Sequence, residues 1–219
     1  MSDFAAWDVE LHGHRMVYRV AGDGPPIVLI HGMVNNSRHW RSVALTLADR
    51  YTVIAPDPPL YPSDRAGEVR EAEAWGDGEL QNLGRRLPWG ALHFRPEAMG
   101  TFGGAEPLDG PGTDFAIKLI RGTWKYHGLS AELIEKDLAG LPAKLDHIDA
   151  LAADGVIGTE EATAADLQIG ATIRVLMVVE DLLPLIEGRP AEEVARRWFP
   201  DYTGSVPAGA FPAGWVPSR

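Results

Sequence analysis

A His-Gly turn is the feature of this sequence with the clearest chemical potential. Residues 27–40, IVLIHGMVNNSRHW, run from an apolar stretch through His31 and Gly32 into a predicted helix. A turn in this position can present backbone N–H groups to the oxyanion that develops when a nucleophile attacks a carbonyl. Such a turn contributes to catalysis only beside a nucleophile and a base.

The sequence has no nucleophile at the position that this turn requires. An elbow of the form Gly-x-Ser-x-Gly follows a strand and opens a helix. Gly100 and Gly104 are the only glycines with this spacing, and Phe102 between them cannot attack a carbonyl. None of the seven serines has the predicted surroundings of an elbow, and the absence of cysteine excludes a thiolate. We therefore expect the turn to serve no nucleophile.

The remaining polar candidates favour structural roles. His31 fits a residue that makes hydrogen bonds within the turn, and Asp57 fits a turn residue at a strand end rather than the acid of a triad. His12 and His14 would share a strand face, as metal ligands require, but Gly13 between them favours a hairpin turn. The other histidines have no ligand spacing, so we predict no metal site.

Short strands and one helix are predicted to carry the His-Gly turn. WDVEL and RMVYRVAG, separated by HGH, predict a hairpin. PPIVLIHG is typical of a strand that is covered on both faces, and YTVIAPD predicts a second buried strand. Ser37 fits the N-cap of the helix between them, which we expect to extend to about Asp49. Strand, helix and strand with short connections predict a parallel pair with a right-handed crossover.

The rest of the chain has a helical pattern. Apolar residues recur at helical spacing between Val69 and Leu87. Glycine and proline at 100–113 predict a loop. We expect a helix at about 114–126 and another helix that begins at Ser130 and is interrupted by GLP at 140–142. The C-terminal tail is rich in Pro, Gly and aromatic residues, which predicts an irregular strap.

One helix is apolar on nearly every face. Arg174 is the only charged residue between Leu167 and Val179, which is typical of a helix in the middle of a bundle. The first N–H groups of such a helix lie away from water and need partners within the protein. Thr163 and Asp166 fit a variant capping box that supplies these partners, so we assign them to folding.

Charge and composition narrow the classes of partner and compartment. The net charge is −11, with −1 on residues 1–57 and −10 on residues 58–219. An acidic surface disfavours nucleic acid and anionic membranes as partners. There is no apolar run long enough to span a membrane and no apolar signal core near the first residue. Together with the absence of cysteine, these features predict a cytoplasmic protein.

Residues 8–57 resemble the beginning of the α/β-hydrolase fold. The resemblance rests on the hairpin, IVLIHGM, the helix after NNSRHW, and YTVIAPD. It implies that the backbone N–H of Met33, after His31 and Gly32, is one oxyanion-hole donor. PPLYPSD replaces the Gly-rich turn of that family, and the nucleophile elbow is absent.

Residues 58–219 resemble the all-helical C-terminal domain of glutathione S-transferase-like proteins, especially bacterial ones. The matching residues include REAEAWGDGELQ, DLAGLPAKLDHIDALAADGVIG, EEATAADLQIGATIRVL and DLLPLIEGRPAEEVARRWFPDY. The box formed by Thr163 and Asp166 is the folding signature of that family.

The second resemblance implies glutathione as a cofactor and an electrophile as its substrate. It also implies an apolar substrate pocket, which Trp75, Trp89 and Trp124 would line, although aromatic residues at helical spacing also fit a core. The thioredoxin-like domain that holds glutathione in the family has no recognisable counterpart here. We therefore expect a glutathione S-transferase-like protein that is catalytically incomplete.

The expected fold class is α+β and mostly α-helical. A small β-β-β-α-β fragment at 1–57 would precede a helical bundle at 58–219, which indicates a chimera joined near 56–62. Two alternatives are a hydrolase-family protein without its nucleophile elbow, and a non-catalytic helical domain that binds a small apolar ligand or a protein partner. The unpaired edge of an incomplete sheet would also favour a homodimer.

Overall fold

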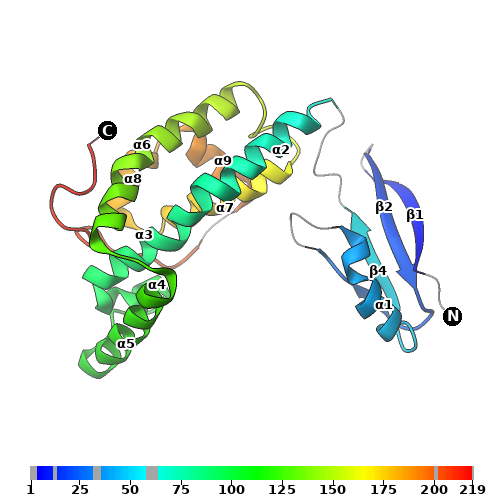
Figure 1. Cartoon of the computed structure of the whole chain (residues 1–219), viewed down its shortest axis with the longest axis horizontal. Helices are drawn as coiled ribbons and strands as arrows, with labels where there is room; N and C mark the ends of the chain where they lie inside the picture. The colour runs from blue at the N-terminus through cyan, green and yellow to red at the C-terminus, as the bar shows by residue number, and fades with distance from the viewer. Residues whose placement is uncertain (1–3, 12–13, 32–35, 58–63, 200–201, 219) are drawn as a thin grey trace. The chain divides into compact units, whose positions relative to one another are not determined.

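The protein is a mixed α+β structure with a small sheet and several helices (Figure 1). The computed structural model describes residues 4–11, 14–31, 36–57, 64–199 and 202–218. The chain divides into two compact units, Met1–Pro62 and Ser63–Arg219. This division falls a few residues after the expected boundary at 57, and the families predicted for the two units are not tested by it.

The N-terminal unit contains a four-stranded sheet in the order β1-β2-β4-β3. Its strands are β1 (Ala5–Leu11), β2 (His14–Ala21), β3 (Pro26–Val28) and β4 (Thr52–Asp57). The pairs β1–β2 and β2–β4 are antiparallel, whereas β3 and β4 are parallel. The predicted hairpin and the predicted parallel pair are therefore confirmed. Residues 12–13, between β1 and β2, lie outside the described residues.

The core of this unit lies on one face of the sheet, against helix α1 (Arg41–Leu47). Val53 and Ala55 on β4 are fully buried there, packed with Ala44 on α1. The sequence pattern predicts that PPIVLIHG forms a strand that is covered on both faces. This prediction is wrong for the described unit, because Val28 is 56% exposed and Ile30 is 68% exposed. Burial alternates along β4, as expected of a sheet that a helix covers on one side.

The start of the helical segment before β4 differs from the prediction. Asn36, not Ser37, is the N-cap residue, because its side chain accepts a hydrogen bond from the Arg38 N–H at 3.0 Å. A 3-10 turn η1 (Ser37–Trp40) precedes α1, which ends before Asp49. The Ser37 hydroxyl is engaged elsewhere, as described below, so it cannot cap the helix.

The C-terminal unit is a bundle of helices. Its elements are α2 (Ala66–Trp75), the π-helical segment η2 (Gly76–Leu80), α3 (Gln81–Phe94), η3 (Pro96–Ala98), α4 (Met99–Phe102), α5 (Gly110–His127), α6 (Ala131–Ala153), α7 (Ala164–Leu176), η4 (Glu180–Leu182), α8 (Leu183–Ile186) and α9 (Pro190–Trp198). Figure 1 shows α2 and α3 as one long helix, and α3 packs against both α6 and α7. Within the described ranges, no helix is both long enough and apolar enough to cross a membrane.

Two predictions about helix boundaries are wrong. The segment predicted as a loop at 100–113 contains the end of α4 and the start of α5, whose N-cap is Asp109. Helix α6 runs without interruption through Pro142, although proline removes one backbone donor from a helix. Leu141 and Leu145 are fully buried beside this proline. We infer that their packing outweighs the local cost of Pro142.

Helix α7 begins with a complete capping box. The Thr163 hydroxyl accepts a hydrogen bond from the Asp166 N–H at 3.2 Å and donates to Asp166 Oδ2 at 2.7 Å. The Thr163 N–H donates to the same carboxylate oxygen at 2.9 Å, and the Gly158 N–H donates to Oδ1 at 2.6 Å. The Asp166 side chain is thus buried with three donors, and it joins the start of α7 to the loop that precedes it.

An ion pair connects α3 to α6. Arg86 Nε lies 2.6 Å from Asp137 Oδ2, and Arg86 Nη2 donates to Oδ1 at 3.0 Å. Burial raises the pKa of Asp137, and the positive charge of Arg86 offsets part of this effect. The folded protein therefore binds a proton at Asp137 more tightly than the unfolded chain, so ionisation of Asp137 costs stability as pH rises.

The C-terminal tail is an irregular strap, as predicted. The Val206 N–H donates to the Val178 carbonyl at 2.8 Å, and the Glu180 N–H donates to the Val206 carbonyl at 3.0 Å. The Asp181 carboxylate accepts hydrogen bonds from three successive N–H groups, those of Gly209, Ala210 and Phe211. These contacts attach the strap to the segment that follows α7.

Asp166→Ala tests the importance of the capping box. The change removes the acceptor of the buried Thr163 N–H and hydroxyl and of the partly buried Gly158 N–H, so the free energy of unfolding should fall by about 2–4 kcal/mol. Urea denaturation monitored by circular dichroism measures this quantity. Glu160→Ala, which removes an exposed carboxylate from the preceding loop, should change stability by less than about 0.5 kcal/mol. Equal stability of the two variants would contradict the role of Asp166.

Arg86→Met tests the ion pair and its dependence on pH. At about pH 7 the variant leaves the Asp137 carboxylate buried without its partner, so the free energy of unfolding should fall by roughly 3 kcal/mol. At about pH 4 the loss should be smaller, because the raised pKa of Asp137 favours its protonation at acidic pH, and protonation removes the buried charge. Urea denaturation at both pH values measures the difference.

The matched control for this prediction is Arg85→Met, which changes the exposed neighbouring arginine on α3. It should alter the free energy of unfolding by less than about 0.5 kcal/mol at either pH. A loss for Arg86→Met that is the same at both pH values would show that the pair with Asp137 is not its cause.

Candidate functional site

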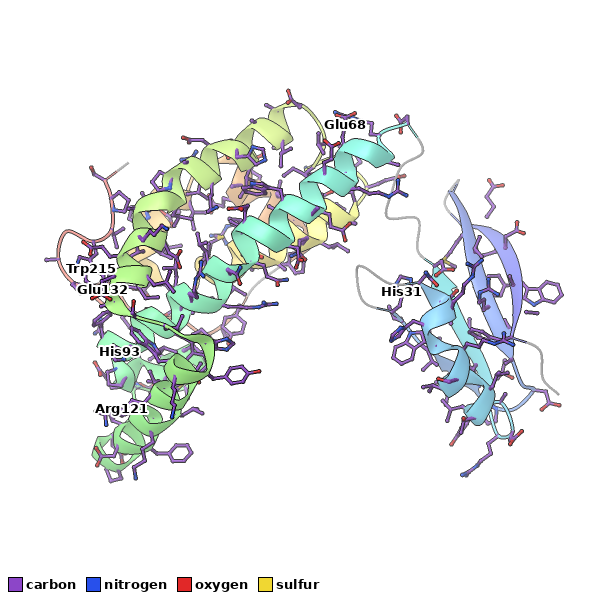
Figure 2. The ribbon with its side chains drawn as sticks, in the orientation of Figure 1. His31, Glu68, His93, Arg121, Glu132 and Trp215 are labelled. Atoms are coloured by element: carbon purple, nitrogen blue, oxygen red, sulfur yellow. The ribbon has the colours of Figure 1, made fainter. Side chains whose placement is uncertain are left out.

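The N-terminal unit contains a cluster formed by His31, Ser37 and Asp57. His31 Nε2 lies 3.3 Å from Asp57 Oδ1, at the C-terminal end of β4 (Figure 2 labels His31). The Ser37 backbone N–H donates to Asp57 Oδ1 at 2.5 Å, and the Ser37 hydroxyl donates to Oδ2 at 2.7 Å. One carboxylate thus connects the histidine of the His-Gly turn, the start of η1 and the end of β4.

This cluster has the residue types of a catalytic triad but not its arrangement. In a triad, histidine lies between serine and aspartate, so that it can take the serine proton. Here Asp57 lies between Ser37 and His31, and Ser37 is fully buried. The geometry supports the interpretation of His31 and Asp57 as turn residues. Gly32 and Met33, the other members of the predicted oxyanion turn, lie outside the described residues.

Two of the three tryptophans predicted to line a pocket, Trp89 and Trp124, are in contact, whereas Trp75 lies elsewhere. Trp124 Nε1 on α5 donates to the Trp89 carbonyl on α3 at 3.0 Å. Trp75 lies at the end of α2, with its ring 4.3 Å from that of His147 on α6. Because 14 residues of the same long helix separate Trp75 from Trp89, the two are roughly 20 Å apart. A role of these tryptophans in substrate binding stays a prediction.

An aromatic cluster surrounds Trp124 instead. The His93 ring stacks on Trp124 with ring centroids 3.8 Å apart, and the ring centroids of Phe94 and Trp215, a residue of the strap, are 5.4 Å apart. Figure 2 labels His93 and Trp215. Partial burial lowers the pKa of His93, and the positive charge of Arg121 lowers it further. A neutral His93 is suited to stacking on Trp124.

Among the cavities that described residues of the helical unit line, we compare three, and the largest of these three is lined mainly by apolar groups. Cavities of about 230 Å³ lie beside His93 and beside Arg197. The third, which we call the α7–α9 cavity, has a volume of about 460 Å³, within the usual range for small-molecule sites. Its lining residues are Phe102, Ala171, Arg174, Val175, Val178, Trp198, Phe199 and Tyr202.

The strap and a glycine on α7 shape this cavity. A Cβ atom at Gly170 would lie 3.2 Å from the Phe199 ring, so glycine lets that ring approach α7 closely. At Gly204 a Cβ atom would lie 2.1 Å from the Phe102 carbonyl, so the strap can pass α4 only with glycine there. The Tyr202 hydroxyl also donates to the Phe102 carbonyl at 2.9 Å. The cavity wall is therefore built from segments far apart in sequence.

Of the described residues that line the cavity, Arg174 is the only charged one. Its Nε donates to the Phe199 carbonyl at 3.1 Å, at the C-terminal end of α9. Within the described ranges, no group of three or more metal-ligating side chains is present. The described lining is thus suited to binding an apolar molecule.

Sequence reasoning missed most of this site. Phe102 was noticed only as the residue between Gly100 and Gly104, and Trp198 and Tyr202 were not singled out. The available signal was Arg174, the lone charge on an otherwise apolar helix. A charge in such a segment needs either a structural partner or a functional one.

Comparisons with known proteins find only a partial match. No protein-family model matches the chain. A stretch of 47 residues, 22% of the chain, is 55% identical to an uncharacterized protein of Mycobacterium bovis and to one of Mycobacterium tuberculosis, and it covers 14% of each. A stretch of the same length is 49% identical to a soluble epoxide hydrolase of Corynebacterium sp. and covers 16% of it.

The chain thus spans about a sixth or less of the length of these curated relatives. The match to an epoxide hydrolase supports a hydrolase-like segment of limited length. Nothing in the comparisons supports the resemblance of residues 58–219 to glutathione S-transferases, which stays a prediction.

Proposed function

We propose that this protein binds a small apolar molecule in the α7–α9 cavity and performs no chemistry on it. The observation that carries the proposal is the cavity of about 460 Å³ with walls of aromatic and aliphatic side chains. Sites for small molecules are concave, largely apolar and equipped with a few polar groups, and this cavity has those properties. The proposal corresponds to the alternative of a non-catalytic helical ligand-binding domain.

A hydrolase-related function is the second candidate. Its support is the 49% identity to a soluble epoxide hydrolase over 47 residues, together with the contact between His31 and Asp57. We infer that the matched stretch falls within residues 8–57, the segment that resembles a hydrolase. The buried Ser37 and the missing elbow argue that such a segment retains the supporting framework without the nucleophile.

We infer that the helical unit is derived from a glutathione S-transferase-like protein. The capping box of Thr163 and Asp166 at the start of a buried helix supports this origin. Glutathione is the cofactor that such an origin implies, and an electrophile is the substrate. The described part of the N-terminal unit has one helix and the strand order β1-β2-β4-β3, so it offers no evident thioredoxin-like site for glutathione. Two such origins would make the chain a chimera.

We also propose a homodimer in the cytoplasm. Trp7, Val28 and Ile30 of the N-terminal unit are each more than half exposed, and burial against a second copy would remove this apolar surface from water. The net charge of −11 argues against nucleic acid and anionic membranes as partners.

A neutral bicyclic aromatic alcohol, 2-naphthalenemethanol, tests the proposed binding function. Isothermal titration calorimetry should detect saturable binding to the full chain, because the cavity buries an apolar ring system. Val175→Trp places a large side chain in the lining and should weaken binding at least about tenfold. Val175 is 41% exposed, so the substitution is compatible with folding.

Val43→Trp is the matched control, because Val43 is also helical and 42% exposed but lies on α1 of the other unit. It should leave the affinity unchanged. Absence of binding to the unaltered protein, or equal weakening by both variants, would refute the proposed site.

A panel of activities tests the alternatives. The full chain should not be retained on immobilised glutathione, should not conjugate glutathione to a generic electrophile, and should not hydrolyse activated esters or an epoxide. A fluorophosphonate should label no serine, because the Ser37 hydroxyl is buried and donates to Asp57. Stoichiometric labelling would restore the hydrolase candidate, and glutathione-dependent turnover would restore the transferase candidate.

A further inference from the structure

We propose that the α7–α9 cavity selects apolar molecules that carry a carboxylate, and that Arg174 binds this carboxylate. The inference rests on the proposed binding function and names the chemical class of its ligand. Among the described lining residues Arg174 is the only charged one, and the others are apolar or aromatic. A ligand with one anionic end and an apolar body matches this distribution.

The guanidinium of Arg174 has donors to spare. Only its Nε is engaged, with the Phe199 carbonyl, and the two Nη atoms donate to no described residue. No carboxylate within the described ranges forms an ion pair with Arg174. Arg86 and Arg196, in contrast, each pair with a carboxylate of this chain. A guanidinium anchored by Nε presents its remaining N–H groups in the geometry that suits a carboxylate.

A second donor belongs to the same lining. Trp198 Nε1 is buried, and no described residue accepts its hydrogen bond. Buried N–H groups in proteins nearly always have an acceptor, so this one indicates a missing partner. The other polar group of the lining, the Tyr202 hydroxyl, is already used by the Phe102 carbonyl. An acceptor supplied by the ligand would satisfy Trp198.

The charge of the site favours a carboxylate over a phosphate group. One guanidinium neutralises one negative charge, whereas a doubly charged phosphate would keep an uncompensated charge against apolar walls. The net charge of −11 disfavours the entry of polyanions further. The ligand class is therefore an apolar monocarboxylate, such as an aromatic acid.

Arg174 also has a structural role that must be separated from binding. By donating to the Phe199 carbonyl it satisfies the C-terminal end of α9, where a positive charge is favourable. That role uses Nε, whereas ligand binding would use the Nη atoms. A structural role alone predicts no discrimination between charged and neutral ligands.

The test compares 2-naphthoate with 2-naphthalenemethanol, which has the same ring system without the charge. Isothermal titration calorimetry on the full chain should show about 10- to 100-fold tighter binding of the carboxylate, and the preference should shrink at high salt. Arg174→Gln should abolish the preference, so that this variant binds the two compounds with affinities within about threefold of each other. Arg174→Lys, which keeps the charge but not the planar fork, should retain part of it.

Arg196→Gln is the matched control, because Arg196 lies on α9 and outside the lining. It should leave the preference for the carboxylate intact. Equal affinities of the two compounds for the unaltered protein, or a preference that survives Arg174→Gln, would overturn the inference without affecting the proposed function. Failure of both compounds to bind would refute the proposed function and the inference with it. If Arg174→Gln does not fold, the salt dependence and the comparison of the two compounds still decide the question.

Discussion

The buried carboxylate of Asp166 is the interaction on which the helical unit depends. A helix apolar on nearly every face can occupy the middle of a bundle only if its first N–H groups find acceptors inside the protein. Asp166 accepts three hydrogen bonds and, with the Thr163 hydroxyl, begins α7 at a defined residue. Because α7 packs against α2, α3 and α9, its starting point sets the register of the bundle.

The same helix that depends on this cap carries the candidate binding site at its other end. Ala171, Arg174 and Val175 lie in the last turns of α7, and the strap crosses beyond them. Glu180 and Asp181 attach the strap by accepting backbone hydrogen bonds from residues 208–211. The cavity therefore depends on two sets of folding interactions. One is the capping box at the start of α7, and the other attaches the strap beyond the end of α7.

In the N-terminal unit, the carboxylate of Asp57 joins segments that are distant in sequence. Asp57 accepts two hydrogen bonds from Ser37 and lies beside His31. These contacts stabilise the arrangement of β4, η1 and the end of the apolar stretch that precedes the His-Gly turn. The partial match to a soluble epoxide hydrolase agrees with the resemblance in the sequence. The buried serine and the order of the three groups nevertheless favour structure over catalysis.

Patterns local in sequence were sufficient to determine several features of this protein. The hairpin, the parallel strand pair, the buried helix and the Thr163–Asp166 box follow from alternation, helical periodicity and cap spacing, which act over a few residues.

Tertiary structure decided the rest. Pro142 stays within α6 because Leu141 and Leu145 are buried against neighbours, and Val28 stays exposed because the described unit covers only one face of its sheet. Arg174, Trp198 and Tyr202 meet at one cavity because α7, α9 and the strap pack together, and contacts between segments so far apart leave no periodic signal in the sequence.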